Sequence, residues 1–276
     1  MCQVLAVSRS GYYKWLTSGP SKRSVFNRQL LVDIRQIHEQ SKQTYGSPRI
    51  TAALKDFDII VSRPRVARLM QKAGIRSKLR RKYVITTDSR HKFPVSENLL
   101  DRNFKVGTIG KAWVSDITYI KTEQRWLYLT TVIDLGDRKV IGWSFGDSLK
   151  AEDTSMAALT MAVKSRPVTS KLIFHSDRGV QYACEQFRDL LKTHPTVQQS
   201  MSRKGNCWDN AVAESFFKTL KAEWTNWFHY KTTEQAALSV FEYIEGWYNT
   251  RRKHSALNFK TPAEYEQYLL TKKLAA

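Results

Sequence analysis

The sequence has few cysteines and no long apolar run, and each shortage excludes a class of protein. Its 276 residues include only three cysteines, at positions 2, 184 and 207, and no CxxC pair, which argues against a disulfide scaffold or a cysteine zinc site. The apolar stretches are about strand length, shorter than the ~20 residues that cross a bilayer. The N-terminus has no basic-then-apolar secretory pattern. We therefore expect a cytoplasmic protein with no membrane partner and one or two domains.

Acidic residues are also scarce, with 25 Asp+Glu against 45 Lys+Arg and a formal charge of +20. Residues 1–100 hold 20 cations and 6 acids, a net of +14, and the remaining residues have a net of +6. Such an excess calls for an anionic partner, most commonly nucleic acid. The competing idea, an anionic membrane surface, requires a basic amphipathic helix with exposed aromatic residues. No segment of the sequence has that pattern.

Residues 1–75 predict a helical DNA-binding domain with two short helix–turn–helix patterns. In the first, residues 4–16, Ser8 can cap the second helix. The second pairs residues 48–55 with 62–73, and Ser62 is its candidate N-cap. An apolar stripe on this last helix is formed by Val66, Leu69 and Met70. Three arginines lie off the stripe, so the helix can contact a DNA groove, although a plain packing role fits equally well.

Residues 76–108 are charged and irregular and predict a basic linker. Five of the seven residues 76–82 are Lys or Arg. This segment is either a solvated connection or a strap that contacts phosphates, and the sequence favours neither reading.

Residues 109–230 predict an α/β core, and residues 231–276 a C-terminal helical extension. The expected strands are 112–120, 126–135, 139–145, 171–176 and 196–201, and the expected helices are 151–164, 185–192 and 209–224. Three consecutive strands followed by strands that alternate with helices favour a mixed sheet covered by helices.

Three acids in this core have unusual positions. Asp116 lies inside an apolar strand, Asp177 directly follows a strand, and Glu214 lies inside a helix. A buried carboxylate is costly unless it is paired or bound to a metal, and carboxylate oxygens are preferred magnesium ligands. Two such ions can activate the attacking oxygen and stabilise the leaving one at phosphorus. Taken singly, each acid also fits an ordinary turn, ion-pair or surface role.

The helix of Glu214 separates charge from apolar surface. Glu214, Lys218 and Lys221 fall on one face. A separate stripe that can pack on the sheet is formed by Val212, Phe216 and Leu220. The preceding loop, residues 202–210, is basic and can hold a DNA backbone. Its Trp208 either offers a stacking face or, the reading we favour from sequence, is buried.

These motifs resemble the second-frame (OrfB) transposases of the IS-three family of bacterial insertion sequences. The resemblance covers nearly the whole chain and is carried by residues 2–16, 45–50, 115–119, 175–182, 200–214, 248–257 and 261–265. It implies an RNase H-like, retroviral integrase-like catalytic core with an N-terminal helix–turn–helix domain. By motif position, Asp116, Asp177 and Glu214 are the implied catalytic and metal-binding DDE triad.

The resemblance also implies an activity and its partners. The activity is nicking at the ends of an insertion sequence, followed by transfer of the 3′-hydroxyl to another phosphodiester. The implied cofactor is two Mg²⁺ ions per site, with Mn²⁺ as a substitute. The implied partners are terminal inverted repeats and target DNA, a second copy of the chain on paired ends, and a first-frame (OrfA) product or fusion. A DNA partner further implies association with the nucleoid.

Two departures from the family pattern bear on these expectations. Positions 178–213 place 36 residues between Asp177 and Glu214, one more than the family usually has. We expect the extra residue in the loop near 192–196, where insertions are tolerated. The zinc-binding domain of retroviral integrases has no counterpart in the six His and three Cys.

The expected DNA contacts come from basic residues along the chain. They are Arg63, Arg65, Arg68, Arg80, Arg81, Lys82, Arg203, Lys204, Lys218, Lys221, Arg251 and Arg252. Asp134 either contributes to the site or, the reading we favour, caps a turn ahead of Gly136. His175 either modulates the metal site or, the reading we favour, is a satisfied structural histidine. Arg178 can reach a phosphate or neutralise the acids. Trp224, Trp227 and Phe228 are expected to pack in the core or between domains.

Two other functions fit parts of this pattern. The first is an RNase H-like nuclease or resolvase that cleaves without joining ends. The second is a non-catalytic DNA-binding regulator derived from a transposase, although the presence of all three acids argues against it. The terminal repeat sequence, the target preference and the oligomeric state have no signature in the sequence.

Overall fold

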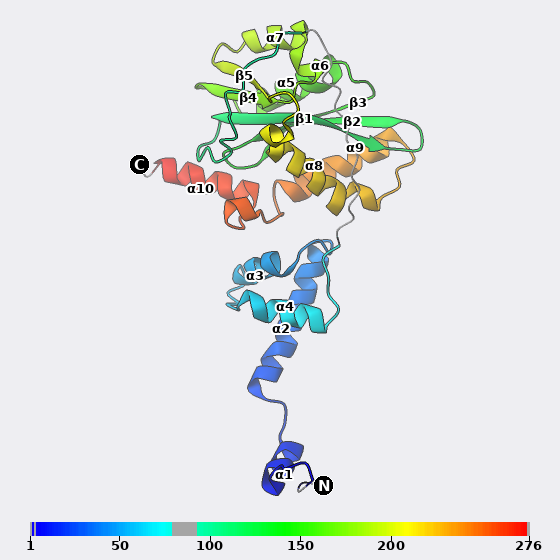
Figure 1. Cartoon of the computed structure of the whole chain (residues 1–276), viewed down its shortest axis with the longest axis vertical. Coiled ribbons are helices and arrows are strands. Elements are labelled where there is room, and N and C mark those ends of the chain that lie inside the picture. Colours follow the sequence, from blue (N-terminus) through cyan, green and yellow to red (C-terminus); the bar gives the residue numbers. More distant parts are fainter. Residues whose placement is uncertain (1, 3, 79–92, 275–276) are drawn as a thin grey trace. The chain divides into compact units, whose positions relative to one another are not determined.

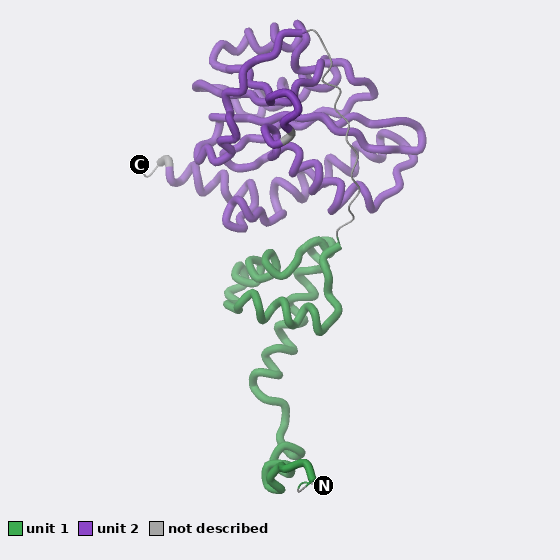
Figure 2. The backbone as a smooth tube through the Cα atoms, in the orientation of Figure 1, with its two compact units in different colours: residues 1–78 green, residues 79–276 purple. Residues whose placement is uncertain are grey.

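The computed structural model describes residues 2, 4–78 and 93–274. The chain forms two compact units, residues 1–78 and residues 79–276 (Figure 2). Within the described residues, no helix is both long and apolar enough to cross a bilayer.

Unit 1 is helical, as its sequence predicts. Its helices are α1 (Arg9–Thr17), α2 (Lys22–Gln40), α3 (Ser47–Lys55) and α4 (Arg63–Lys72) (Figure 1). Ser8 caps α1 as predicted, because its Oγ accepts the Gly11 N–H at 3.0 Å. Ser62 occupies the N-cap position of α4, but its side chain makes no capping hydrogen bond. A small core joins α2, α3 and α4 and contains Leu30, Ile34, Ile50, Leu54, Val66 and Met70.

Unit 2 is built on a five-stranded mixed sheet in the order β3-β2-β1-β4-β5. The strands are β1 (Ala112–Lys121), β2 (Trp126–Asp134), β3 (Val140–Gly146), β4 (Leu172–Ser176) and β5 (Val197–Met201). The first three strands form an antiparallel meander, whereas β4 pairs in parallel with β1, and β5 in parallel with β4. The five predicted strands and the mixed sheet are thus confirmed.

Helices cover both faces of the sheet (Figure 1). One face carries the π-helical turn η1 (Glu152–Met156) with α5 (Ala157–Ser165), α6 (Val180–Ala183) and α7 (Glu185–Lys192). The other carries α8 (Ala211–Glu223), α9 (Thr233–Phe241) and the π-helical segment η4 (Glu242–Tyr248), followed by α10 (Pro262–Leu274). The core on the first face includes Trp113, Phe174, Tyr182 and Phe187, all fully buried. Helices on both faces leave β2 buried along most of its length.

Both edges of the sheet meet other parts of the chain. Beside β5, the Leu99 N–H donates to Ser200 Oγ at 2.9 Å, and the Met201 N–H donates to the Glu97 carbonyl at 3.3 Å. Part of the predicted linker, from residue 96 onward, therefore packs on the core. Beside β3, the Asn249 side chain donates to the Val140 carbonyl and accepts the Val140 N–H, both at 3.0 Å. Such contacts satisfy edge groups that would otherwise be free to pair with another chain.

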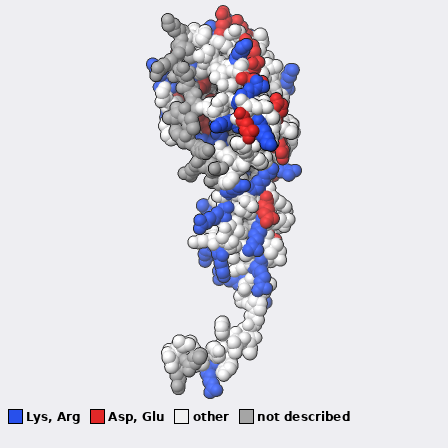
Figure 3. All heavy atoms as spheres, turned by 90° about the vertical axis from the view of Figure 1, so that its right-hand side faces the viewer, with Lys and Arg blue, Asp and Glu red and all other residues white. Residues whose placement is uncertain are grey.

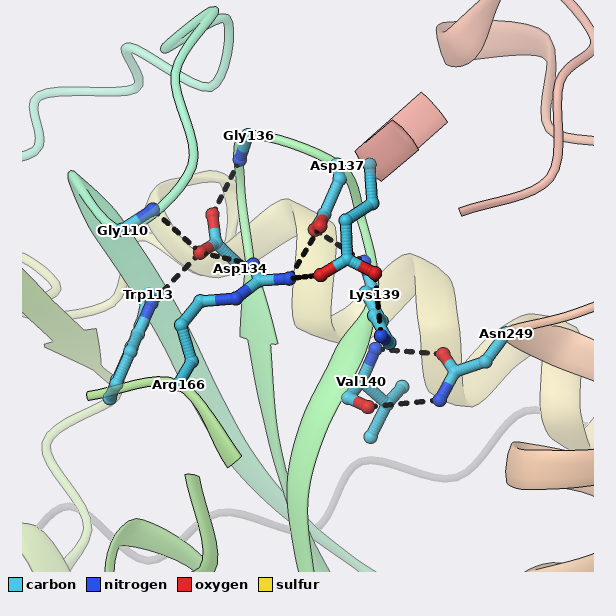
Figure 4. A network of polar contacts seen from close by, with 10 residues as sticks. Gly110, Trp113, Asp134, Gly136, Asp137, Lys139, Val140, Arg166 and Asn249 are labelled. Atoms are coloured by element: carbon cyan, nitrogen blue, oxygen red, sulfur yellow. Dashed lines mark hydrogen bonds and ion pairs between the residues drawn. The ribbon is translucent and has the colours of Figure 1, made fainter. Parts of the chain in front are cut away.

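A buried polar network fastens α5 and α10 to the turn between β2 and β3 (Figure 4). Arg166 pairs with Asp134 at 2.6 Å, with Asp137 at 2.7 Å and with Glu266 of α10. Burial raises the pKa of Asp137 to about 6, against the opposing effect of Arg166. Asp134 Oδ1 accepts the Gly136 N–H at 2.8 Å, so its predicted turn-capping role is confirmed. It lies three register positions from Asp116.

Candidate active site

Asp116 and Asp177 lie on neighbouring parallel strands. Asp116 is inside β1, and Asp177 directly follows β4. The register pairs Val114 with His175, so Asp116 and Asp177 are each two positions further along their strands. The strand pairing therefore brings two acids that are 61 positions apart in sequence to the same level of the sheet.

Glu214 approaches from the first turn of α8. One turn earlier, Asn210 is buried, and its Nδ2 donates to the Ser115 carbonyl at 3.0 Å. This bond ties the start of α8 to the residue beside Asp116. The predicted apolar stripe is present as Phe216 and Leu220, accompanied by Ala213 and Phe217 rather than by half-buried Val212. The polar face of α8, with Glu214 and Lys218, is accessible to solvent.

Two of the three acids act electrostatically on Asp116. Burial raises the pKa of Asp116 well above its usual range, and the neighbouring carboxylates of Asp177 and then Glu214 raise it further. The Ile117 N–H, 2.8 Å from Asp116 Oδ1, and the Lys221 ammonium oppose the rise. Carboxylates that cannot all ionise together retain a proton unless a cation neutralises them. The surroundings of Asp116 thus carry an excess of negative charge.

Each carboxylate has a local partner. Asp177 Oδ1 accepts the Gly179 N–H at 2.9 Å, and Glu214 lies 3.5 Å from Lys218 Nζ. Across the described residues, no three His, Cys, Asp or Glu side chains converge into a set that could hold a metal ion. The donor chemistry, carboxylate oxygens with excess negative charge, fits a hard divalent cation. Binding such an ion would replace the contact between Glu214 and Lys218 in particular.

Buried side chains around the acids make a rigid support. His175 Nδ1 lies 2.8 Å from Ser200 Oγ, and Nε2 lies 3.2 Å from Ser202 Oγ. Burial lowers the pKa of His175 to about 4, so the ring is neutral at pH 7. The expectation of a satisfied structural histidine is confirmed. On the other side, the Tyr182 hydroxyl shares a 2.7 Å hydrogen bond with Ser115 Oγ.

The basic loop before α8 is held by Asp209, which the sequence interpretation missed. Its buried carboxylate accepts the Arg203 N–H at 3.0 Å, Arg203 Nε at 2.9 Å and Arg102 Nε at 2.8 Å. These bonds, with Arg203 first, hold the pKa of Asp209 well below its usual range. Its position between Trp208 and Asn210 at a helix start was the available signal. Trp208 itself is 69% exposed, so the interpretation of a buried Trp208 is wrong.

The expected DNA-binding residues have different environments. Arg63, Arg68, Lys204, Lys218 and Arg251 are exposed, whereas Arg80, Arg81 and Lys82 lie outside the described residues. Arg65 is half-buried, binds Asn27 Oδ1 and lies over the Phe26 ring. Lys221 Nζ lies 5.1 Å from the centre of the Tyr119 ring. On the face drawn in Figure 3, Lys and Arg side chains gather over unit 1 with few acids among them.

Arg252 corrects the expectation of a DNA contact. It is buried, and its guanidinium makes two bonds of 2.7 Å to Glu223 at the end of α8. An unpaired buried charge is costly, and the planar guanidinium suits a bidentate carboxylate partner, so Arg252 anchors the C-terminal segment to α8. Trp224 is buried as expected, whereas Trp227 and Phe228 are partly exposed. Arg178 Nε donates to the Ser202 carbonyl at 2.6 Å.

Comparison with known proteins identifies the family of this chain. A 31 kDa protein of insertion element IS600 from Shigella sonnei is 39% identical over 267 residues, 97% of each chain. Transposase InsF of insertion sequence IS3A from Escherichia coli (strain K12) is 39% identical over 268 residues, 96% of this chain and 92% of that one. The chain belongs to the IS3-family transposases.

Family models agree with the two units of this IS3-family transposase. An HTH-like domain matches residues 26–83, and integrase core domains match residues 109–207 and 196–262. Unit 2 is therefore an RNase H-like integrase core, and the helix–turn–helix of unit 1 marks a DNA-binding protein. Among solved structures, the catalytic core of BIV integrase is 17% identical and covers 59% of this chain and 99% of that one, with a TM-score of 0.44. The assignment rests on the curated relatives and the family models.

Proposed function

We propose that this transposase cleaves DNA at the ends of an insertion sequence and transfers the freed 3′-hydroxyl to a second phosphodiester, in a reaction dependent on divalent metal ions. The observation that carries the proposal is that β1 and β4 bring Asp116 and Asp177 to the same level of the sheet, where the charges of Asp177 and Glu214 both act on Asp116. Three acids from two strands and a helix, in a strongly basic chain, suit the handling of a polyanion with cations. No side chain is required to attack phosphorus.

Asp116, Asp177 and Glu214 are the residues that would hold Mg²⁺ ions, two per site in our proposal, with Mn²⁺ as a substitute. When bound, such ions activate the attacking oxygen and stabilise the leaving oxygen. The protein supplies position: the parallel pairing of β1 with β4 sets the two aspartates, and the bond from Asn210 to Ser115 sets the helix that carries Glu214. In-line geometry held this way lowers the barrier without a covalent enzyme intermediate.

Cations beside the acids, two of them exposed and Lys221 half-buried, would hold the DNA backbone. Lys218 and Lys221 share the face of Glu214, and Lys204 lies in the loop before α8. Contacts of this kind fix the register of the DNA but do not read its sequence. The reading of terminal repeats belongs in this proposal to unit 1, through Arg63 and Arg68 on α4. Joining two ends further requires at least two copies of the chain, with or without a first-frame (OrfA) partner.

The substitution Asp177→Asn tests the proposal. It keeps the shape and the hydrogen bond to Gly179 but removes one negative charge. We expect end cleavage and the joining of pre-cleaved ends to fall by more than about 10³-fold, with folding and DNA binding retained. Asp189→Asn on α7, an exposed acid paired with Lys192, is the matched control and should be active. Normal joining by Asp177→Asn would refute the proposal, and cleavage without joining by the native chain would identify a nuclease.

A further inference from the structure

Trp208 is a large aromatic side chain in an unusual place. It is 69% exposed and lies in the short helical turn η2 (Cys207–Asn210), six residues before Glu214. Burying a tryptophan normally stabilises a fold by removing its large apolar surface from water. Across the part of the chain that the structure describes, its ring has no aromatic or hydrogen-bonding partner. The chain therefore presents this surface to solvent without benefit to its own packing.

The backbone that carries Trp208 is firmly held. Asp209, directly after it, is buried and binds Arg203 and Arg102. Asn210, the next residue, is buried and donates to the Ser115 carbonyl. The Asp209 N–H also donates to the Asn206 carbonyl at 3.3 Å, which closes the turn around Trp208. A rigid backbone with an exposed ring is a preorganised contact, because little conformational entropy is lost when the ring is covered.

The neighbours of Trp208 suit an anionic partner. Arg203 and Lys204 precede it on the same loop and are exposed, and Lys218 on α8 has a side chain that is 67% exposed. Cations that follow a phosphate backbone, combined with an exposed aromatic ring, are the means by which proteins bind single-stranded nucleic acid. In an intact duplex the faces of the bases are covered by their neighbours. Away from the outer face of the last pair, an aromatic platform can therefore act only where a base is unpaired.

We propose that Trp208 is the stacking platform for an unpaired base of the DNA end, next to the phosphate at which the acids act. The ring would hold a frayed terminal base away from its partner, while Lys204 and Lys218 hold the backbone of the same strand. This inference rests on the proposed function, because it assumes that a DNA end lies at Asp116, Asp177 and Glu214. It adds a residue that selects opened ends over continuous duplex.

The test compares two DNA ends that differ only in whether the last base pairs can open. One carries mismatches at the terminus, and the other is locked by an interstrand crosslink. Stacking contributes about 1–3 kcal/mol per base, which is a loss of roughly 5- to 150-fold in affinity when removed. We expect Trp208→Leu to bind the mismatched end weaker by this factor and the locked end within about twofold of the native chain. Trp208→Phe should recover most of the difference.

A fluorescent base identifies the contact directly. With 2-aminopurine at the terminal position, stacking on the indole quenches emission, so the complex with Trp208→Leu should be brighter than that with the native chain. Trp227→Leu is the matched control, since Trp227 is a partly exposed tryptophan of the same unit whose indole donates to the Ala222 carbonyl. Its complex should resemble the native one.

Two outcomes would overturn the proposal. Equal loss of affinity for mismatched and locked ends would make Trp208 a general contact rather than a base platform. Unchanged affinity together with unchanged fluorescence would show that no base reaches the ring. Both readouts are measured with catalytically inactive Asp177→Asn as the background, so they report stacking whether or not the proposed chemistry holds. The activity of Asp177→Asn tests that chemistry separately.

Discussion

The buried pair of Arg252 and Glu223 gives a prediction that separates a structural role from a DNA-binding role. The sequence placed Arg252 in a basic cluster and predicted a DNA contact. The structure instead joins it to Glu223 through two bonds of 2.7 Å, with 4% of each side chain exposed. Replacing Arg252 with Met keeps most of the length of the side chain and removes the charge. The variant should lose stability and keep its affinity for DNA.

The size of the stability loss in Arg252→Met follows from the burial of its partner, Glu223. Removing one member of a buried ion pair leaves the other charge without compensation, at a cost of about 3–5 kcal/mol. For a folding unit of roughly 150–250 residues, each kcal/mol shifts the melting temperature by about 2–4 °C. We therefore expect a decrease of about 6–20 °C. The double variant Arg252→Met with Glu223→Leu should be more stable than Arg252→Met alone, because it leaves no buried charge unpaired.

The assay is calorimetry of each variant, with DNA affinity measured well below its melting temperature over a series of salt concentrations. The matched control is Arg251→Gln at the exposed neighbouring position. It should melt like the native chain and lose affinity, with a salt slope smaller by about one if Arg251 contacts one phosphate. The reasoning is refuted if Arg252→Met melts at the native temperature while its affinity for DNA and its salt slope fall.

Three further predictions concern buried polar groups of unit 2. His175 has a pKa of about 4 when folded against about 6.5 when unfolded, so the unfolded chain binds more protons between these values. The free energy of unfolding should therefore fall by about 2–3 kcal/mol from pH 7.5 to pH 4.5. Denaturant unfolding at both pH values should show a smaller difference in His175→Gln, and an unchanged difference would contradict the prediction. Arg166→Met leaves Asp134 and Asp137 buried without their cation and should lower the free energy of unfolding by about 3–5 kcal/mol. Adding Asp137→Asn should restore part of this loss. Urea titrations in which the losses of the two single variants simply add in the double variant would argue against this reading. Asn210→Ala removes the bond to β1 and should raise the Mg²⁺ concentration needed for half-maximal cleavage. Its melting temperature should fall by only a few degrees. An unchanged Mg²⁺ dependence would show that the bond does not position Glu214.

Much of the fold could be predicted because local patterns agree with tertiary burial. The strand beginning at Ala112 and the helix Glu185–Lys192 were predicted with their observed starts, since alternation and helical spacing report directly which side is covered. The π-helical turn before α5 could not be predicted, because the residues around Thr154 have an ordinary helical pattern. Asn249, which fills the edge of β3 through Val140, was missed because its role depends on a strand 109 positions away.

The side chains show the same limit. Trp208 and Arg252 have similar sequence contexts, each beside basic residues and a helix end, and composition favours a buried tryptophan and an exposed arginine. The structure has the opposite in both cases. Whether a side chain is covered depends on what the rest of the chain brings to it: Glu223 reaches Arg252, and nothing in the described chain stacks on Trp208. Asp209 was overlooked for the same reason, since Arg102 comes from outside its own loop.

The central claim is that Asp116, Asp177 and Glu214 gather around shared divalent ions when a DNA end is bound. The most direct measurement is a crystal structure of the chain with a DNA end and Mn²⁺, in which anomalous scattering locates the ions. We predict that Glu214 leaves Lys218 and that oxygens of all three carboxylates lie about 2.1 Å from the ions. Ions held by other residues, or a Glu214 carboxylate still paired with Lys218 beside occupied ion sites, would contradict the account.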